Sequence, residues 1–197
     1  MAQPVEGRKG YTYADYLTWD DDKRWEIIEG VAYEKIEGPS IVSDMSPAPS
    51  RKHQAIVANL VRKIGTYLMG KSGRIFPAPF DVRFSESGNV TIVQPDLSIF
   101  CSNEYLDESG ASGAPDWIVE ILSPYTLQKD MGLKFQLYEK SGVKEYWIVD
   151  PAKKNVSVFI SGKNGRYERR SESGENENIF SFVYPDLEIN LREIFSL

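Results

Sequence analysis

The chain has 197 residues, with 23 Lys or Arg against 29 Asp or Glu, so its formal net charge is −6. The apolar fraction of 41% is ample for a packed core, which excludes wholesale disorder. Cys101 is the only cysteine and His53 the only histidine, which excludes a disulfide-built fold and a cysteine-based zinc cluster. A bound metal would therefore be a hard cation held by carboxylates.

Two further classes are excluded by the hydropathy pattern. No apolar run approaches the roughly 20 residues of a membrane-spanning helix, and the N-terminus has no secretory signal. We therefore expect a cytoplasmic protein. The acidic balance also argues against a protein that simply coats nucleic acid.

The charge is unevenly distributed along the chain. Residues 45–80 contain no Asp or Glu but carry six basic residues, Arg51, Lys52, Arg62, Lys63, Lys71 and Arg74. This block has a local charge of +6, so the remaining residues carry −12. One interpretation is a solvated basic helix face. The other is an electropositive patch beside an acidic pocket, which a phosphodiester substrate requires.

The first fifty residues predict a helix, a hairpin and a loop. Thr12 and Asp15 have the spacing of a capping box, which predicts a short helix ending near Trp19. Residues 24–36 predict two strands with a tight turn between them. Residues 37–50 are rich in Gly and Pro and predict a surface loop.

The clearest predicted helix spans residues 51–69. One stripe at 3.6-residue spacing contains His53, Ile56, Val57, Leu60, Val61, Ile64 and Leu68. After it, residues 74–84 predict one strand or a bent pair, interrupted by two prolines. Strand signals recur at 90–100 and at 116–122, and the second of these is nearly all apolar, as in a central buried strand.

The remaining residues complete a mixed α/β pattern. They predict a helix at 127–140, a buried strand at 144–149, a hairpin within 153–183 and a short helix at 191–195. From residue 51 onward, the order of helix, strands, helix and strand is typical of helices packed on a central mixed sheet.

Two carboxylates lie within apolar strands. Glu120 has five large apolar neighbours, and a buried carboxylate is costly unless it is paired or binds a metal. The alternative is that Glu120 lies at the end of its strand, in contact with water. Asp96 follows Pro95, which cannot donate to a ladder and can aim the carboxylate out of the sheet. The alternative for Asp96 is an ordinary turn.

Two candidate cations lie on predicted helices. Lys134 falls near the centre of the apolar arc of its helix, so it would point inward and could meet a carboxylate. The alternative is an i,i+4 pair with Asp130. His53 lies on the apolar stripe of its helix and is the only imidazole in the chain. Its alternative role is that of a core or capping residue.

These residue types form a recognisable chemical set. Carboxylates on adjacent strands can bind Mg²⁺ or Mn²⁺, which polarises a phosphoryl oxygen and lowers the pKa of a water. An ammonium can orient that water or neutralise charge that develops on phosphorus.

Seven stretches of the chain resemble the Uma2 family of restriction endonuclease-like proteins, over residues 11–195. The stretches are RWEIIEGVAYE, MSPAPSRKHQAIVANL, PFDVRF, VQPDLSIF, GAPDWIVEILSPYT, KFQLYEKSGVKEYWIVDP and YPDLEINLREIF. The family belongs to the PD-(D/E)xK nuclease superfamily. This resemblance implies an αβββαβ core and divalent-metal-dependent hydrolysis of phosphodiesters.

The superfamily motif is matched in part. Pro95-Asp96 is similar to its PD, and Glu120 is similar to its D/E. The motif lysine is missing, because Leu122 stands two residues after Glu120. Some members bring the lysine from the following helix, which makes Lys134 the candidate. The resemblance places His53 on the first core helix, where other members carry an acidic residue.

The combined prediction is one restriction endonuclease-like domain, an α+β fold over residues 1–197. Its core would span about 51–151, with an N-terminal helix and hairpin at 11–36 and a C-terminal hairpin and short helix at 153–197. The predicted activity is DNA cleavage with Mg²⁺ or Mn²⁺, by a homodimer if both strands are cut. Alternatives are a non-catalytic DNA-binding or protein-interaction module, or a metal-dependent hydrolase of a small phosphorylated molecule.

Individual roles follow from this prediction. Asp96 and Glu120 would hold the metal, Lys134 would assist the attacking water, and His53 would support the site or bind phosphate. Four basic residues of the first core helix would lie near the nucleic-acid backbone: Arg51, Lys52, Arg62 and Lys63.

Overall fold

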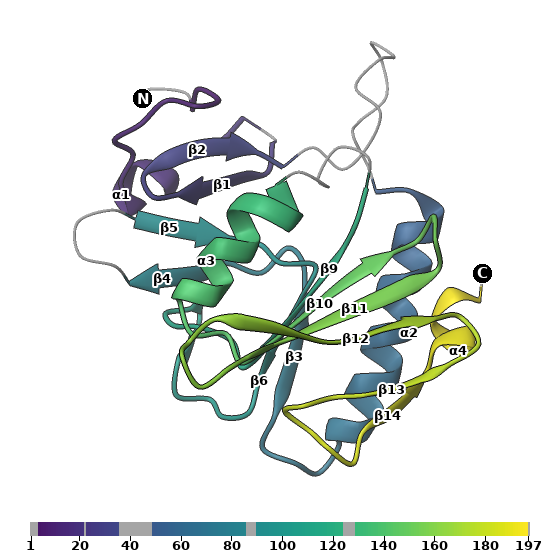
Figure 1. The fold of residues 1–197 in the computed structure, drawn as a ribbon. Coiled ribbons are helices and arrows are strands. Elements are labelled where there is room, and N and C mark those ends of the chain that lie inside the picture. Colours follow the sequence, from purple (N-terminus) through teal and green to yellow (C-terminus); the bar gives the residue numbers. More distant parts are fainter. Residues whose placement is uncertain (1–3, 22, 36–48, 86–89, 124–128, 197) are drawn as a thin grey trace.

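The computed structural model describes residues 4–21, 23–35, 49–85, 90–123 and 129–196 (Figure 1). Most of the predicted loop at 37–50 and the start of the helix predicted from 127 lie outside these ranges. The fold is a mixed α+β arrangement, and this class is the one that the sequence predicts. It contains two six-stranded sheets. Within the described ranges, no helix is long and apolar enough to cross a membrane.

The first sheet gathers strands from the first 111 residues. Its order is β2 (Val31–Glu34), β1 (Trp25–Ile28), β5 (Val90–Val93), β4 (Val82–Ser85), β8 (Gly110–Ala111) and β7 (Leu106–Asp107). The predicted hairpin is confirmed, and Glu29 and Gly30 form its turn with φ of 51° and 77°. The capping box at Thr12 is also confirmed, but α1 (Tyr13–Tyr16) ends before Trp19.

The second sheet carries the long apolar strands. Its order is β12 (Tyr167–Gly174), β11 (Asn155–Ser161), β10 (Glu145–Asp150), β9 (Trp117–Ile121), β6 (Leu97–Phe100) and β3 (Arg74–Pro77). Strands β9 and β10 are parallel. The segment between them carries a π-helical turn (Lys129–Leu133) followed by α3 (Lys134–Lys140).

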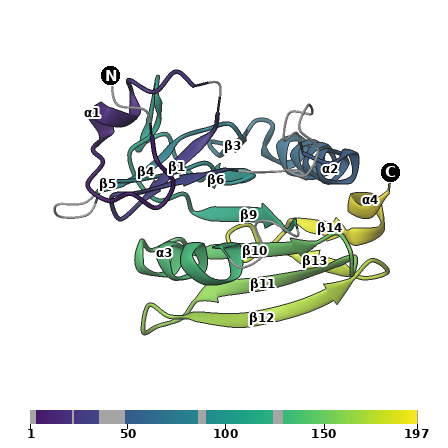
Figure 2. The same cartoon turned by 90° about the horizontal axis from the view of Figure 1, so that it is seen from above.

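Both faces of the second sheet are covered, which explains why β9 is apolar except at Glu120. On one face, Trp117, Val119 and Ile121 pack with α2 (Arg51–Leu68) and α4 (Leu191–Phe195). On the other, Ile118 packs with α3 and with side chains of the first sheet. Glu120 shares the face of Ile118, because side chains alternate along a strand. Figure 2 shows β9 to β12 one beside the next, with α2 and α3 well apart.

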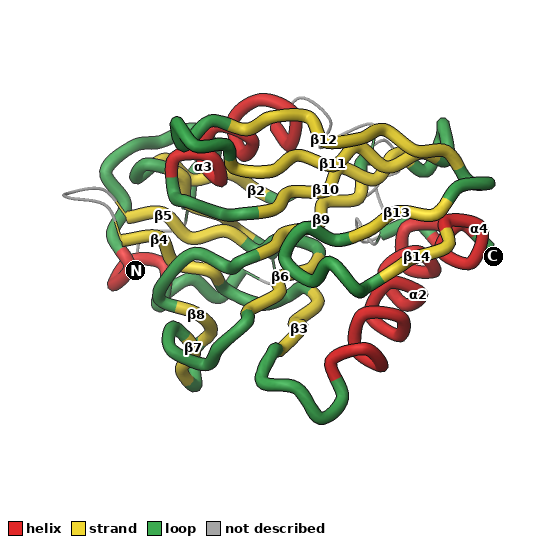
Figure 3. Tube along the Cα trace, turned by 60° about the horizontal axis from the view of Figure 1, so that its bottom comes forward, coloured by secondary structure: helices red, strands yellow, loops and turns green. Residues whose placement is uncertain are grey.

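A small sheet closes the C-terminal side. It contains β13 (Asn178–Phe180) and β14 (Glu188–Asn190), which lie beside α4 and α2 (Figure 3). The short final helix lies where the sequence predicts it.

The main departure from the predicted pattern is that two strand segments are divided between the sheets. Residues 74–84 form β3 in the second sheet and β4 in the first. Residues 90–100 form β5 in the first sheet and β6 in the second, with Gln94, Pro95 and Asp96 between them. Because proline cannot donate to a ladder, Pro95 ends one pairing before the next begins. The predicted mixed central sheet corresponds to the second sheet, in which β3, β6, β9 and β10 lie together, whereas β4 and β5 belong to the first sheet.

Candidate active site

The crossing between the sheets places two carboxylates beside each other. Strands β6 and β9 are antiparallel with Leu97 opposite Val119, so Asp96 and Glu120 are neighbours at one end of this pair. The amide nitrogen of Asp96 lies 3.4 Å from Oε2 of Glu120. The amide of Ile121 donates to Oδ2 of Asp96 at 2.8 Å. Asp96 is 5% exposed and Glu120 2%, so both carboxylates are in the interior.

Helix α3 supplies the partners of Glu120. Oε1 of Glu120 accepts from Nζ of Lys134 at 2.9 Å and from the hydroxyl of Tyr138 at 2.7 Å. Lys134 and Tyr138 lie one turn apart, so both reach the same oxygen from one face of the helix. The alternative of a solvent-exposed strand end for Glu120 is wrong, because this carboxylate is buried and paired.

The sequence position of Lys134 allows contact with a buried carboxylate or an i,i+4 pair with Asp130, and Lys134 makes both. Its Nζ lies 2.9 Å from Glu120 Oε1, 2.9 Å from Glu26 Oε1 and 3.7 Å from Asp130 Oδ1. Burial alone would lower the pKa of this ammonium, but the surrounding carboxylates raise the pKa well above its ordinary value. Lys134 therefore stays charged and cannot act as a general base near neutral pH.

The partners of Asp96 come from the first core helix and from the hairpin. Nε2 of His53 lies 3.1 Å from Oδ2, and Nζ of Lys35 lies 3.4 Å from Oδ1. A carboxylate only accepts hydrogen bonds, so Nε2 of His53 carries the proton. Burial raises the pKa of Asp96, but Lys35 and His53 outweigh it, and the pKa lies below its ordinary value.

Three charged residues of this site escaped the sequence prediction: Glu26, Lys35 and Lys129. Glu26 on β1 is fully buried, and its carboxylate contacts Lys134 at 2.9 Å and Lys129 at 2.7 Å. Its neighbours Trp25, Ile27 and Ile28 give it the same apolar setting that singled out Glu120. Lys35 follows β2 at the edge of the predicted loop, where no periodic pattern could distinguish it.

The chemistry of the donor set fits a divalent cation. Asp96 and Glu120 offer hard oxygen ligands, and a positively charged group, the ammonium of Lys35, already contacts Asp96 Oδ1 and the carbonyl of Gln94. Among the described residues, no three His, Cys, Asp or Glu side chains form a group that could hold a metal ion. A cation at this position would therefore take further ligands from backbone carbonyls or water.

The basic helix face is partly engaged within the chain. Lys52 donates to the carbonyl of Pro151, and Lys63 lies 3.3 Å from Glu193. Arg51 and Arg62 are exposed on α2. Of the four residues predicted to lie near a nucleic-acid backbone, these two arginines are the more available to a phosphate.

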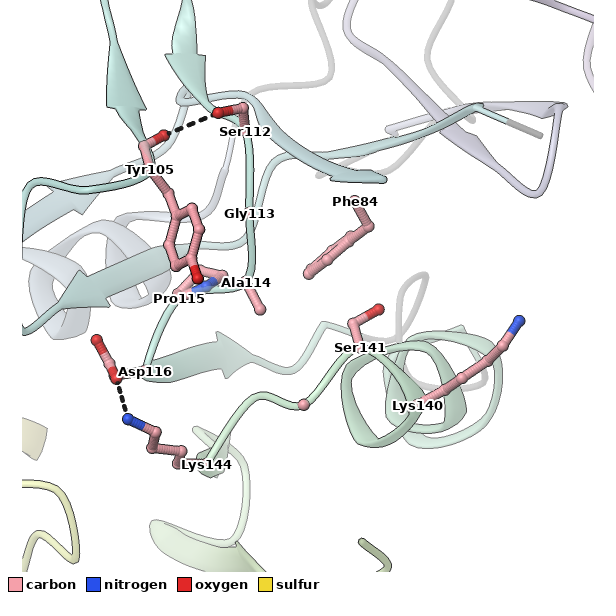
Figure 4. Close-up of a pocket in the computed structure, with 11 residues that line it drawn as sticks. Phe84, Tyr105, Ser112, Gly113, Ala114, Pro115, Asp116, Lys140, Ser141 and Lys144 are labelled. Carbon is pink, nitrogen blue, oxygen red and sulfur yellow. Dashed lines mark hydrogen bonds and ion pairs between the residues drawn. The ribbon is translucent and has the colours of Figure 1, made fainter. Parts of the chain in front are cut away.

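A separate cavity of about 550 Å³ opens at the other end of β9 (Figure 4). Phe84, Tyr105 and Asp116 are among its lining residues, and Asp116 pairs with Lys144 at 2.6 Å. Asp116 precedes Glu120 by four residues, which corresponds to about 13 Å along a strand. None of the site residues predicted from the sequence lines this cavity.

The fold thus has mixed sheets, and Asp96, Glu120 and Lys134 lie together where the two sheets meet. The Uma2 family, described as "Putative restriction endonuclease", matches residues 13–192, and the chain belongs to this family.

The chain is also similar to two individual proteins. A crystal structure described as a putative nuclease belonging to DUF820, from Anabaena variabilis, superposes with a TM-score of 0.68 and 23% identity. The match covers 94% of this chain and 98% of that one, and it establishes the shared fold. An uncharacterized protein of Synechocystis sp. is 24% identical over 154 residues, which are 77% of this chain and 74% of the relative.

Proposed function

We propose that this protein is a divalent-metal-dependent endonuclease that hydrolyses DNA phosphodiester bonds. The observation that carries the proposal is the pair of buried carboxylates, Asp96 and Glu120, on adjacent strands with Lys134 2.9 Å from Glu120. Burying charged groups is costly, and such clusters are more common at functional sites than elsewhere. Membership of a restriction endonuclease-like family supports the same chemistry.

In this proposal Asp96 and Glu120 hold Mg²⁺ or Mn²⁺. When bound, such a cation polarises a phosphoryl oxygen and lowers the pKa of a water. Lys134 takes the place of the motif lysine, since the usual position holds Leu122, which is partly buried against the apolar core. Its permanent positive charge orients Glu120 and offsets negative charge that develops at the scissile phosphate.

The remaining residues of the site position the carboxylates. Tyr138 fixes Glu120 through its 2.7 Å hydrogen bond, and His53 fixes Asp96 from the first turns of α2. Arg51 and Arg62 on the same helix would contact the DNA backbone. Cleavage of both strands calls for two such sites, and a symmetric dimer in the cytoplasm would provide them.

One observation favours a second candidate, a non-catalytic DNA-binding module. Within the described residues, the carboxylates of Glu26, Asp96 and Glu120 each contact at least one lysine ammonium. Because buried charges need either a paired charge or a metal, carboxylates that are paired in this way do not require a metal. In this alternative, the ion pairs hold the fold together and the basic helix alone binds DNA.

Cleavage assays on supercoiled, linear and single-stranded DNA, with Mg²⁺, Mn²⁺ or EDTA, separate the two candidates. We expect metal-dependent cleavage by wild type and its loss, by at least about a hundredfold, in Glu120→Gln and Asp96→Asn. The matched control is Asp116→Asn. Asp116 follows a proline just before β9, as Asp96 follows a proline just before β6, but Asp116 lies outside the site. Control activity should stay within about threefold of wild type.

Two results would contradict the proposal. Equal cleavage by wild type and Glu120→Gln would overturn the assignment of the site. Tight DNA binding by wild type without cleavage of any substrate would favour the non-catalytic module.

A further inference from the structure

The ammonium of Lys35 is held among oxygen atoms at the Asp96 end of the site. Its Nζ lies 2.5 Å from the carbonyl oxygen of Gln94 and 3.4 Å from Asp96 Oδ1. The Lys35 side chain is only 4% exposed. A carboxylate and a backbone carbonyl are also the oxygen ligands that a hard divalent cation takes in proteins. Lys35 therefore contacts the atoms that a metal bound to Asp96 would use.

The charge balance of the site makes these two cations competitors. Among the described residues, four carboxylates, those of Glu26, Asp96, Glu120 and Asp130, contact three ammoniums, those of Lys35, Lys129 and Lys134. Together these seven groups carry a surplus of one negative charge. A divalent cation added to this set would leave a net positive charge in a buried site, which low polarity disfavours.

The ammoniums differ in how firmly they are held. Lys134 contacts three carboxylates from a helix in the interior of the fold. Lys35 lies at the longer distance of 3.4 Å from Asp96 Oδ1, and it follows the last residue of β2 at the edge of the first sheet. Of these two, Lys35 is the ammonium that contacts Asp96, so it is the one that a metal bound to Asp96 would displace.

We propose that Lys35 occupies the cation position at Asp96 in the metal-free protein, and that a divalent cation binds by displacing its ammonium. This inference rests on the proposed function, since it takes Asp96 as a metal ligand. Lys35 is a positioning residue in this account. It neutralises the buried carboxylate while the metal is absent, and it sets the metal concentration at which the site is filled.

Isothermal titration of EDTA-treated protein with MnCl₂ tests the competition without an activity assay. We expect Lys35→Gln to bind Mn²⁺ at least about tenfold more tightly than wild type, because a competing unit charge is removed. Lys35→Arg keeps the charge and should stay within about threefold of wild type or bind more weakly. Lys23→Gln, an exposed lysine beside the same hairpin, is the matched control and should leave the affinity unchanged.

A measurement on the wild type keeps the inference testable if Lys35→Gln does not fold. Brief acetylation followed by mass spectrometry reports how accessible each lysine is. Lys35 should react slowly in EDTA and several-fold faster in saturating Mg²⁺, whereas Lys23 should react equally in both.

The outcomes separate this inference from the proposed function. If wild type binds Mn²⁺ and Glu120→Gln does not, unchanged or weaker binding by Lys35→Gln overturns the inference alone. An unchanged acetylation rate of Lys35 in saturating Mg²⁺ does the same. If neither wild type nor any Lys35 variant binds Mn²⁺, both the inference and the metal-dependent function are wrong.

Discussion

At the scale of single residues, the site is defined by buried charges that satisfy one another. Lys134 contacts carboxylates from β1, β9 and the turn before α3, so one ammonium connects three parts of the chain. The sequence predicted Glu120, Asp96 and Lys134 as site residues because each is polar in an apolar setting. Lys35 could not be predicted, because its burial depends on contacts with residues distant in sequence.

Glu26→Gln tests the strength of this charge network. The substitution leaves a neutral group beside Lys129 and Lys134, whose buried ammoniums then lack one balancing charge. We expect the free energy of unfolding to fall by about 3 kcal/mol. Urea unfolding measures this change. Glu34→Gln, which removes the partner of the exposed Lys23, should cost less than about 1 kcal/mol. Equal losses in the two variants would contradict the account.

The low pKa values of Asp96 and Glu26 predict how stability depends on pH. Burial raises the pKa of each carboxylate, but the nearby ammoniums outweigh burial, so the pKa is lower in the folded than in the unfolded protein. The stability that these two carboxylates contribute is therefore complete above the unfolded pKa of about 4. It is lost as the pH falls from there through the lower folded pKa values. Urea midpoints measured from pH 7 downward should therefore decline below about pH 4. Glu26→Gln should decline less steeply, and parallel profiles would be evidence against this explanation.

At the scale of elements, local signals predicted the structure well where pairing is local. The β1–β2 hairpin has the turn residues Glu29 and Gly30 between its two strands, which is a local signal. Helix α2 likewise has an apolar stripe and a capping serine, Ser50. The division of residues 90–100 between two sheets could not be read from the sequence, because β5 and β6 pair with strands distant along the chain. The π-helical turn before α3 likewise carries no pattern that distinguishes it from an α-helix.

Gln94→Ala tests the junction between β5 and β6. The Gln94 side chain accepts from Arg24 at 2.8 Å, donates to Asp81 at 2.8 Å and to the Tyr16 hydroxyl at 3.4 Å, and the residue is 7% exposed. Loss of these bonds in the interior should lower the free energy of unfolding by about 2 kcal/mol. Asn178→Ala removes two side-chain bonds on the surface and should cost less than about 1 kcal/mol. Chemical denaturation of both variants makes the comparison.

At the scale of the whole molecule, the net charge of −6 is a poor guide to the substrate. Part of the acidic excess is buried at Glu26, Asp96 and Glu120, where lysines neutralise it. The basic residues of α2 contribute the opposite charge. The distribution of charge is therefore compatible with DNA, although the total alone argued against it.

The double variant Arg51→Gln/Arg62→Gln tests the predicted DNA face. If both arginines contact phosphates, DNA affinity falls for all sequences, and the slope of log affinity against log salt decreases by about 2. Fluorescence anisotropy in EDTA at several salt concentrations measures both quantities without cleavage. Arg169→Gln/Arg170→Gln, exposed on β12, is the matched control. An unchanged slope in the α2 variant would place the DNA on another surface.

In the proposed function, Asp96 and Glu120 share a divalent cation. Anomalous diffraction from crystals grown in saturating Mn²⁺ tests it most directly, because it locates the metal independently of activity. We expect a peak within about 2.0–2.6 Å of one oxygen from each carboxylate, with the Lys35 ammonium moved away from Asp96. A fully occupied peak elsewhere, or no peak at saturating Mn²⁺, would contradict the account.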